Sequence, residues 1–192
     1  LAANMASYLA FYKKRKILLI DWDLEAPGLH SFFNIQKHEI KKGLIELLYS
    51  YIDVIKKNKN AKTEDLPFFT ENDIIKKGNI HLIPAGNYND NYKQKINDFK
   101  WKDFYFSKSG KYYIEFLKTK LKELDYDYIF IDSRTGVTDY SGICNIQMPD
   151  INIIVVGPTQ QNLDGCKEII KEIKQSPYTK EDFRKPHIIP VL

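Results

Sequence analysis

Two apolar runs in this chain end directly in an aspartate. Residues 17–20 (ILLI) show no alternation with polar residues and lead into Asp21-Trp22-Asp23, and residues 128–131 (YIFI) lead into Asp132. A short unbroken apolar run is typical of a strand covered on both faces, as in a parallel sheet between helices. Because such sheets bind ligands beyond the carboxyl ends of their strands, the two acidic strand ends are the first candidate site.

The remaining pattern alternates between strands and helices. Strands are predicted over 17–21, 79–84, 127–132 and 151–156, with the start of another at 188–191. Helices are predicted over 1–12, 43–57, 112–124 and 162–174, and the aromatic-rich region 87–109 is expected to be irregular with short helices. The run 151–156 (INIIVV) is expected to be fully buried. This alternation predicts an α/β fold, a doubly wound, mostly parallel sheet with helices on both faces.

The amino-acid composition excludes few classes of protein. The 192 residues, 43% of them hydrophobic, suffice for one α/β domain over residues 1–192. A spread-out net charge of +4 supports neither a nucleic-acid nor a membrane partner, and no run approaches the roughly 18 apolar residues of a transmembrane helix. Two cysteines, Cys144 and Cys166, form no disulfide framework, so we expect a reduced, cytoplasmic setting.

Both ends of the chain look truncated. The sequence begins without a methionine inside a helical pattern, and it stops at Pro190-Val191-Leu192 within a predicted strand. We therefore expect these residues to be a fragment of a longer protein.

The acidic strand ends suit a hydrated Mg²⁺, which takes one or two protein carboxylates together with phosphate oxygens. Asp132, followed by Ser133 and Thr135, fits this role, and Asp23 lies on a loop from which it could orient an attacking water. The alternative is that the aspartates only cap helices or bind turn amides, as aspartate often does. Two acids on matched strands, each followed by a Gly-containing polar loop, favour the phosphate and metal site.

Several longer stretches resemble the ParA/MinD-type P-loop ATPases. They are ILLIDWDLEAPGL (17–29), YDYIFIDSRTGVTDYSGICNIQMPD (126–150) and INIIVVGPTQQNLDG (151–165). The match is to the branch with DLEAPGL and DSRTG motifs, and IPAG (83–86) also fits it. LAANMASYLA (1–10) resembles the helix that follows the phosphate loop in that family. The combination is specific, although each piece alone is weak.

The resemblance implies roles for the three aspartates. Asp132 matches the Walker B aspartate, which holds Mg²⁺ through water. Asp21 matches the aspartate that closes the preceding strand near the metal and the phosphate loop. Asp23 matches the switch I aspartate that positions the hydrolytic water.

The resemblance also implies nucleotide-binding residues after the later strands. These are Ser133, Arg134, Thr135 and Gly136, which match the switch II segment that senses the γ-phosphate, and Pro158, which follows the strand leading toward the base. Arg134 stands where many relatives have proline. It could contact phosphate or a partner subunit, or it could pair with Asp139, and the sequence leaves these open.

The implied activity is Mg²⁺-dependent binding and hydrolysis of ATP by a molecular switch that dimerises with a second copy, with a further protein stimulating the reaction. The Gly-rich phosphate loop of that family, of KGG-x-G-K-[ST] type, is absent from the 192 residues and is expected immediately before Leu1. The process that such a switch would drive is not specified by these residues.

Two rival functions remain open. One is a P-loop-like scaffold or interaction domain that does not hydrolyse ATP. The other is a haloacid-dehalogenase-type phosphatase, in which Asp21 would be the nucleophile and Asp23 the acid/base. That family has Thr or Val two residues after the second aspartate, where Glu25 stands in this sequence.

Overall fold

The computed structural model describes residues 1–133, 142–176 and 185–191. The chain divides into two compact units, Leu1–Arg134 and Thr135–Leu192, and each is described by itself. The expectation of one domain over residues 1–192 stays a prediction.

The first unit is built on a four-stranded sheet with the order β2-β3-β1-β4. Strand β1 lies in its middle and pairs in parallel with β3 and β4, whereas β2 pairs antiparallel with β3. The strands are β1 (Ile17–Asp21), β2 (Ile75–Lys77), β3 (Ile80–Ile83) and β4 (Tyr128–Asp132). The three predicted strands of this unit are confirmed, and β2 is an addition that the sequence did not predict.

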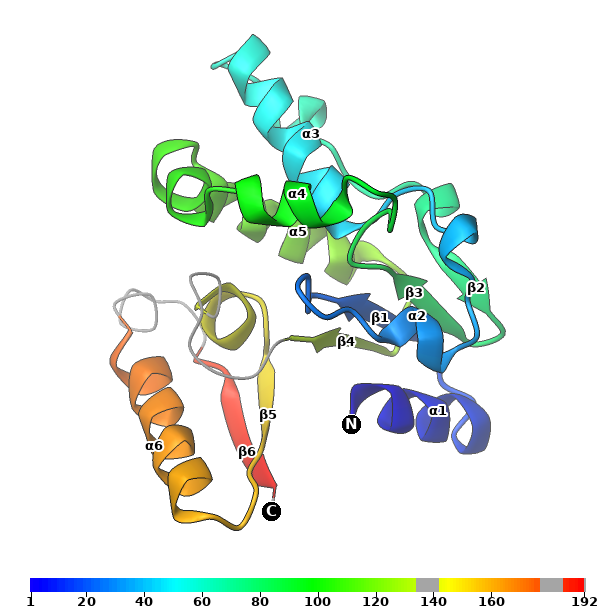
Figure 1. Cartoon of the computed structure of the whole chain (residues 1–192), viewed down its shortest axis with the longest axis vertical. Helices are drawn as coiled ribbons and strands as arrows, with labels where there is room; N and C mark the ends of the chain where they lie inside the picture. Colours follow the sequence, from blue (N-terminus) through cyan, green and yellow to red (C-terminus); the bar gives the residue numbers. More distant parts are fainter. Residues whose placement is uncertain (134–141, 177–184, 192) are drawn as a thin grey trace. The chain divides into compact units, whose positions relative to one another are not determined.

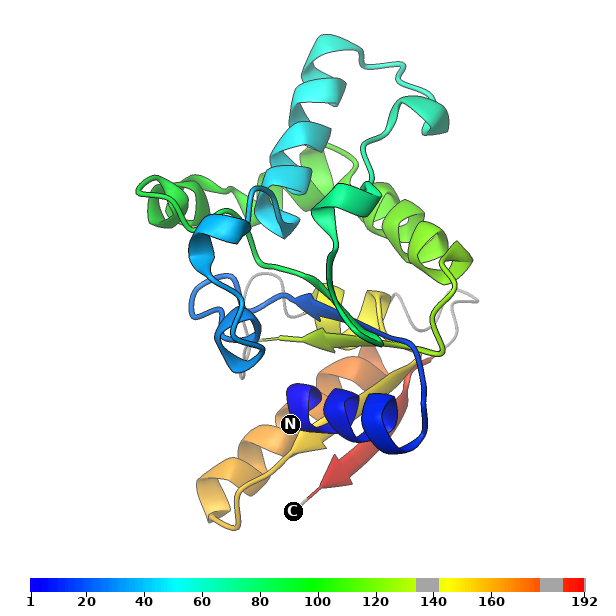
Figure 2. The same ribbon diagram turned by 90° about the vertical axis from the view of Figure 1, so that its right-hand side faces the viewer.

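Helices cover both faces of this sheet, as predicted. In Figure 1 and Figure 2, α1 lies on one side of the sheet, and α3 and α5 lie on the other. The α-helices are α1 (Ala2–Tyr12), α2 (Leu29–Phe32), α3 (Leu44–Lys57), α4 (Tyr92–Asp98) and α5 (Gly110–Glu123). The short 3-10 helices are η1 (Lys37–Glu39), η2 (Thr63–Asp65) and η3 (Glu71–Asp73), and η4 (Asp103–Ser107) is a π-helical turn.

The core of the first unit forms around β1, whose five residues are all buried. On one face, α1 presents the small residues Ala3, Ala6 and Ala10 to Ile17 and Leu19. Small side chains let the helix lie close to the strand, and the uninterrupted aliphatic run is explained by helices on both sides.

Strand β4 is less buried than the sequence suggested. Tyr128 is 47% exposed, and the other four residues of the strand are half-buried. The reason is its place at the edge of the four-stranded sheet, where it pairs with β1 alone among the strands of this sheet. A parallel strand with one neighbour shields only part of its surface.

The aromatic-rich region 87–109, which forms short helices as expected, also contributes to packing. Phe104 is fully buried and contacts Tyr51 edge to face, with ring centroids 5.8 Å apart. Tyr51 also stacks on Tyr113 of α5 at 4.0 Å. These contacts bind the region to α3 and α5 through the geometry that aromatic pairs prefer.

The second unit contains a two-stranded parallel sheet and one long helix. Its elements are η5 (Ile143–Gln147, a π-helical turn), β5 (Ile151–Val155), α6 (Gln160–Gln175) and β6 (His187–Val191). The expectation that 151–156 is fully buried is wrong, because Ile151 is 56% and Val155 is 61% exposed. Within the described residues β5 pairs only with β6, so its other edge lacks a neighbouring strand.

Two expectations about the whole chain can be compared with the described residues. Cys144 and Cys166 are free, in agreement with the predicted lack of a disulfide framework. None of the helices in the described ranges is both long enough and apolar enough to cross a membrane.

Candidate functional site

The two acidic strand ends lie side by side. Asp21 and Asp132 are register partners in the parallel pair of β1 and β4. The Trp22 amide then donates to the Asp132 carbonyl oxygen at 2.8 Å, so the pairing continues one residue beyond the strands. The sequence-based expectation that these two residues share one edge of the sheet is confirmed.

The Asp21 carboxylate is fully buried. Its Oδ2 accepts a hydrogen bond from the Leu29 amide at 3.1 Å, whereas its Oδ1 has no hydrogen-bond partner within the described part of the chain. Burial raises the pKa of this carboxyl to about 7, helped by the neighbouring charges of Asp132 and Asp23 and opposed by the backbone amides of Leu29 and Gly28. A buried carboxylate with one unpaired oxygen is electrostatically incomplete and would gain from a nearby cation.

The Asp132 carboxylate is half-buried, and burial raises its pKa. The charge of Asp23 raises this pKa further. Helix α1 contacts both β1 and β4, the two strands that end in Asp21 and Asp132.

Asp23 belongs to the loop between β1 and α2. Its Oδ1 accepts a hydrogen bond from the Ala26 amide at 3.1 Å, which closes a local turn. Because its charge raises the pKa of both Asp21 and Asp132, the three carboxylates lie within electrostatic range of one another.

The alternative, that the aspartates only bind backbone amides, is thus partly correct, because Asp21 and Asp23 each accept a hydrogen bond from one. It does not account for the unpaired Oδ1 of Asp21 or for the half-buried Asp132. Among the described residues, no group of three His, Cys, Asp or Glu side chains is arranged to hold a metal ion by itself. Mg²⁺ needs only one or two carboxylates beside water and phosphate, so Asp21 and Asp132 fit this ion better than a metal bound entirely by protein.

Of the other predicted nucleotide-binding residues, the structure describes only Ser133 and Pro158. Ser133 directly follows Asp132, whereas Arg134, Thr135 and Gly136 lie outside the described residues, as does Asp139. Pro158 belongs to the second unit, between β5 and α6.

The structure adds aromatic residues that the sequence did not assign to the site. Tyr92 donates from Oη to the Leu24 carbonyl oxygen at 2.7 Å, next to Asp23. The Tyr88 ring lies against the His30 ring at 4.4 Å. Tyr88 lies in the loop before α4, and Tyr92 is the first residue of that helix. No local sequence pattern therefore pointed to their contacts with a loop more than 50 positions earlier in the chain.

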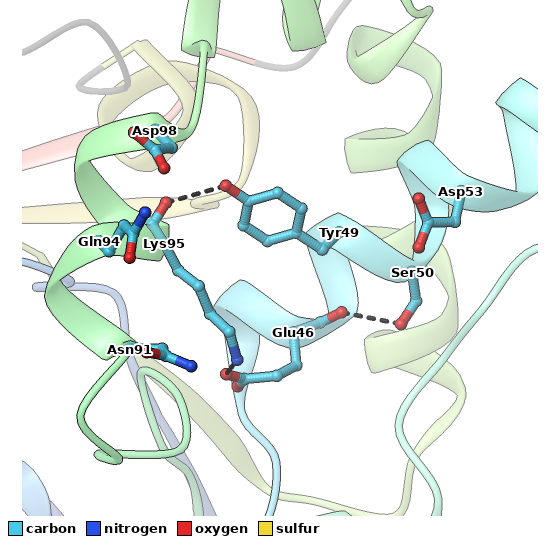
Figure 3. A pocket seen from close by; sticks show the side chains of 8 residues that line it. All are labelled: Glu46, Tyr49, Ser50, Asp53, Asn91, Gln94, Lys95 and Asp98. Carbon is cyan, nitrogen blue, oxygen red and sulfur yellow. Dashed lines mark hydrogen bonds and ion pairs between the residues drawn. The ribbon is translucent and has the colours of Figure 1, made fainter.

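A cavity of about 480 Å³ lies elsewhere, between α3 and α4. Figure 3 shows Lys95 reaching from α4 to Glu46 on α3, with Tyr49 beside them. The Lys95 ammonium lies 2.9 Å from Glu46, and the Tyr49 hydroxyl donates to the Lys95 carbonyl oxygen at 3.0 Å. No predicted site residue lines this cavity, so we do not place the chemistry there.

Comparison with known proteins gives structural matches only. No protein-family model matches the chain, and no curated protein matches it in sequence. Solved structures do match over nearly its whole length. One is the MinC:MinD cell division protein complex of Aquifex aeolicus, with a TM-score of 0.61 and 17% identity over 98% of this chain and 60% of that one.

Two further matches have similar scores. A putative plasmid partition protein from Borrelia burgdorferi, bound to AMPPNP, gives a TM-score of 0.56 and 22% identity over 100% of this chain and 66% of that chain. The kinase domain of the Escherichia coli tyrosine kinase ETK gives a TM-score of 0.55 and 15% identity, covering 98% of this chain and 60% of that chain. The expected likeness to ParA/MinD-type proteins is therefore confirmed as a likeness of structure, and the chain has the P-loop NTPase-like α/β fold that these proteins share.

Proposed function

We propose that this chain belongs to a Mg²⁺-dependent ATP-binding and ATP-hydrolysing switch and supplies the aspartates of its metal site. The observation that carries the proposal is the buried Oδ1 of Asp21, unpaired among the described residues, beside the register partner Asp132. The likeness to a partition protein solved with AMPPNP supports a nucleotide as the ligand.

In this proposal the carboxylates divide the work. Asp132, the more accessible of the strand-end pair, would hold Mg²⁺ through water. The buried Asp21 would lie beside the metal and supply a second negative charge. Bound Mg²⁺ would neutralise charge on the phosphate oxygens. Asp23 orients the attacking water, with its loop fixed by the turn to Ala26.

The proposed switch acts as a homodimer that forms when ATP is bound, and a further protein accelerates hydrolysis. Ser133 to Gly136 and Pro158 are proposed to contact the nucleotide. These parts of the proposal rest on the resemblance of the motifs.

The test is ATP turnover by the full-length protein with and without Mg²⁺, together with its mass in solution with a slowly hydrolysed ATP analogue. Mg²⁺-dependent release of phosphate and a nucleotide-dependent doubling of mass are expected. Nucleotide binding without turnover would favour the scaffold function instead. An acid-stable phosphate on Asp21 would favour the phosphatase chemistry.

A further inference from the structure

We propose that Tyr92 is a positioning residue that fixes the Asp23 loop, residues 22–30, in its working geometry. The inference rests on the proposed function only in taking Asp23 as the working residue of that loop. The contact itself is a property of the first unit and can be tested without nucleotide.

The main contact is a buried hydrogen bond. Tyr92 Oη donates to the Leu24 carbonyl oxygen at 2.7 Å, and Tyr92 and Leu24 are 7% and 1% exposed. Leu24 directly follows Asp23, so the bond fixes the orientation of the peptide group one residue from the Asp23 carboxylate. A buried carbonyl left without its donor is unfavourable, so the bond favours the observed loop conformation over alternatives.

A second contact holds the other end of the loop. The ring of Tyr88 lies against the ring of His30, with centroids 4.4 Å apart, and His30 is 4% exposed. Tyr88 also contacts Tyr92 edge to face at 5.0 Å. One short segment after β3 therefore contacts the Asp23 loop close to both of its ends.

The backbone beneath Tyr92 is shaped to admit its ring. A Cβ atom on Gly86 would lie 2.7 Å from Tyr92 Cε2 and 2.5 Å from Ile45 Cγ2, closer than real Cβ contacts allow. The next residue, Asn87, donates its amide to Glu46 Oε2 at 3.0 Å. The Tyr92 ring thus lies against the backbone of Gly86, which in turn lies against Ile45 of α3, and this support from behind fixes the position from which Tyr92 contacts the loop.

The hydroxyl of Tyr92 stays a donor across the pH range of ordinary assays. Burial raises its pKa above the usual range for tyrosine, and the nearby Tyr88, Asp21 and Glu46 raise it further. The Tyr92–Leu24 bond is therefore insensitive to pH, and the loop geometry it imposes is fixed before any nucleotide binds.

Hydrogen exchange of the nucleotide-free full-length protein tests the positioning directly. We expect Tyr92→Phe to speed exchange of the amides in residues 24–29 by about 10-fold, because a local opening becomes easier when this bond is lost. The matched control is Tyr113→Phe, which removes another buried hydroxyl-to-carbonyl bond, from Tyr113 to Pro67 at 2.8 Å, outside the loop. Equal protection of residues 24–29 in both variants would overturn the inference.

A second variant tests the same inference without changing Tyr92 itself. Gly86→Ala is expected to displace the Tyr92 ring and to speed exchange in the same residues, although Tyr92 keeps its hydroxyl. Unchanged protection in Gly86→Ala, with Tyr92 still bonded to Leu24, would count against the proposed support from behind.

Measuring ATP turnover by the full-length protein tests whether the position of the loop matters for catalysis. Tyr92→Phe should lower kcat by about 10-fold with little change in the KM for ATP, since small misplacements of a catalytic group act on the chemical step, and Tyr113→Phe should leave both unchanged. A normal kcat in Tyr92→Phe would overturn the role in catalysis. An inactive wild-type protein would refute the proposed ATPase instead, and the exchange experiment would still decide whether Tyr92 positions the loop.

Discussion

Asp21 and Asp132 lie side by side as register partners at the carboxyl ends of β1 and β4, and the Trp22 amide donates to the Asp132 carbonyl oxygen at 2.8 Å. In-register residues of neighbouring parallel strands present their side chains to the same face of the sheet. The Asp132 carbonyl oxygen is satisfied by the Trp22 amide, and Oδ1 of Asp21 has no hydrogen-bond partner among the described residues. This pairing determines what each substitution below should do.

Replacing Asp132 should weaken nucleotide binding only when Mg²⁺ is present. In the full-length protein, Asp132→Asn is expected to lower Mg²⁺-dependent ATP affinity by at least about 10-fold, in line with the loss of a metal-holding group. The measurement is a nucleotide titration with Mg²⁺ and with a chelator. Asp125→Asn is the control, because Asp125 is fully exposed in its ion pair with Lys16. An equal loss of affinity with and without Mg²⁺ would assign Asp132 a structural role.

Replacing Asp21 should change how stability depends on pH. Its pKa is raised from 3.8 to about 7 in the folded chain, so the native state binds a proton that the unfolded state has lost between those values. The contribution of this group is therefore fully present below pH 4 and is lost as the pH rises toward 7. At pH 8 the buried charge costs up to about 4 kcal/mol.

Asp21→Asn, which carries no charge, should accordingly be more stable than the wild type at pH 8 in metal-free buffer. The difference should shrink at pH 5, where the wild-type carboxyl is protonated. Thermal unfolding at the two pH values measures this. A difference between the two proteins that is the same at both pH values would show that Asp21 is ionised throughout.

The sequence predicted the pairing of the two aspartates because local signals were enough. Unbroken apolar runs marked β1 and β4, and each run ended in Asp. Strand β2 was missed because it has only three residues, two of them exposed lysines, and it is defined by its pairing with β3. The exposure of Tyr128 depends on β4 lying at the sheet edge, which the order of elements along the chain does not reveal.

The support around the Asp23 loop was beyond sequence reasoning for a different reason. Tyr92 and Leu24 are 68 positions apart, and their bond exists only because the segment after β3 returns to the end of β1. Glu46 presents the same difficulty. In the sequence it is one acidic residue of an amphipathic helix, and its partners come from three separate segments.

Glu46 should be a stability residue rather than a catalytic one. Its Oε2 accepts the amides of Gly43 and Asn87, both at 3.0 Å, and its Oε1 binds the Lys95 ammonium at 2.9 Å. Glu46→Ala leaves these donors without their acceptor and should lower the free energy of unfolding by about 2–3 kcal/mol. Denaturant unfolding measures this loss.

The control for Glu46 is an exposed ion pair on α5. Glu123 binds Lys120 at 2.7 Å, and the side chain of Glu123 is 55% exposed. Glu123→Ala should change the free energy of unfolding by less than about 1 kcal/mol, the usual range for surface pairs. Similar losses in the two variants would contradict a structural role for the Glu46 contacts.

Asp23 offers the sharpest separation between binding and chemistry. It lies beyond the strand-end pair, and its Oδ1 accepts the Ala26 amide at 3.1 Å. Asp23→Ala in the full-length protein should retain Mg²⁺-dependent ATP binding and lose turnover by about 100-fold or more, as expected for a group that acts on the attacking water. Persistent hydrolysis would contradict that role.

Asp23→Asn distinguishes the loss of the turn from the loss of the carboxylate. Asparagine keeps a carbonyl oxygen that can accept the Ala26 amide, so the local turn should survive and protection of this loop from hydrogen exchange should match the wild type. Turnover should still fall well below the wild-type rate, because the amide carries no charge. If Asp23→Asn instead restores full activity, the turn to Ala26 rather than the carboxylate is what the reaction requires from this residue.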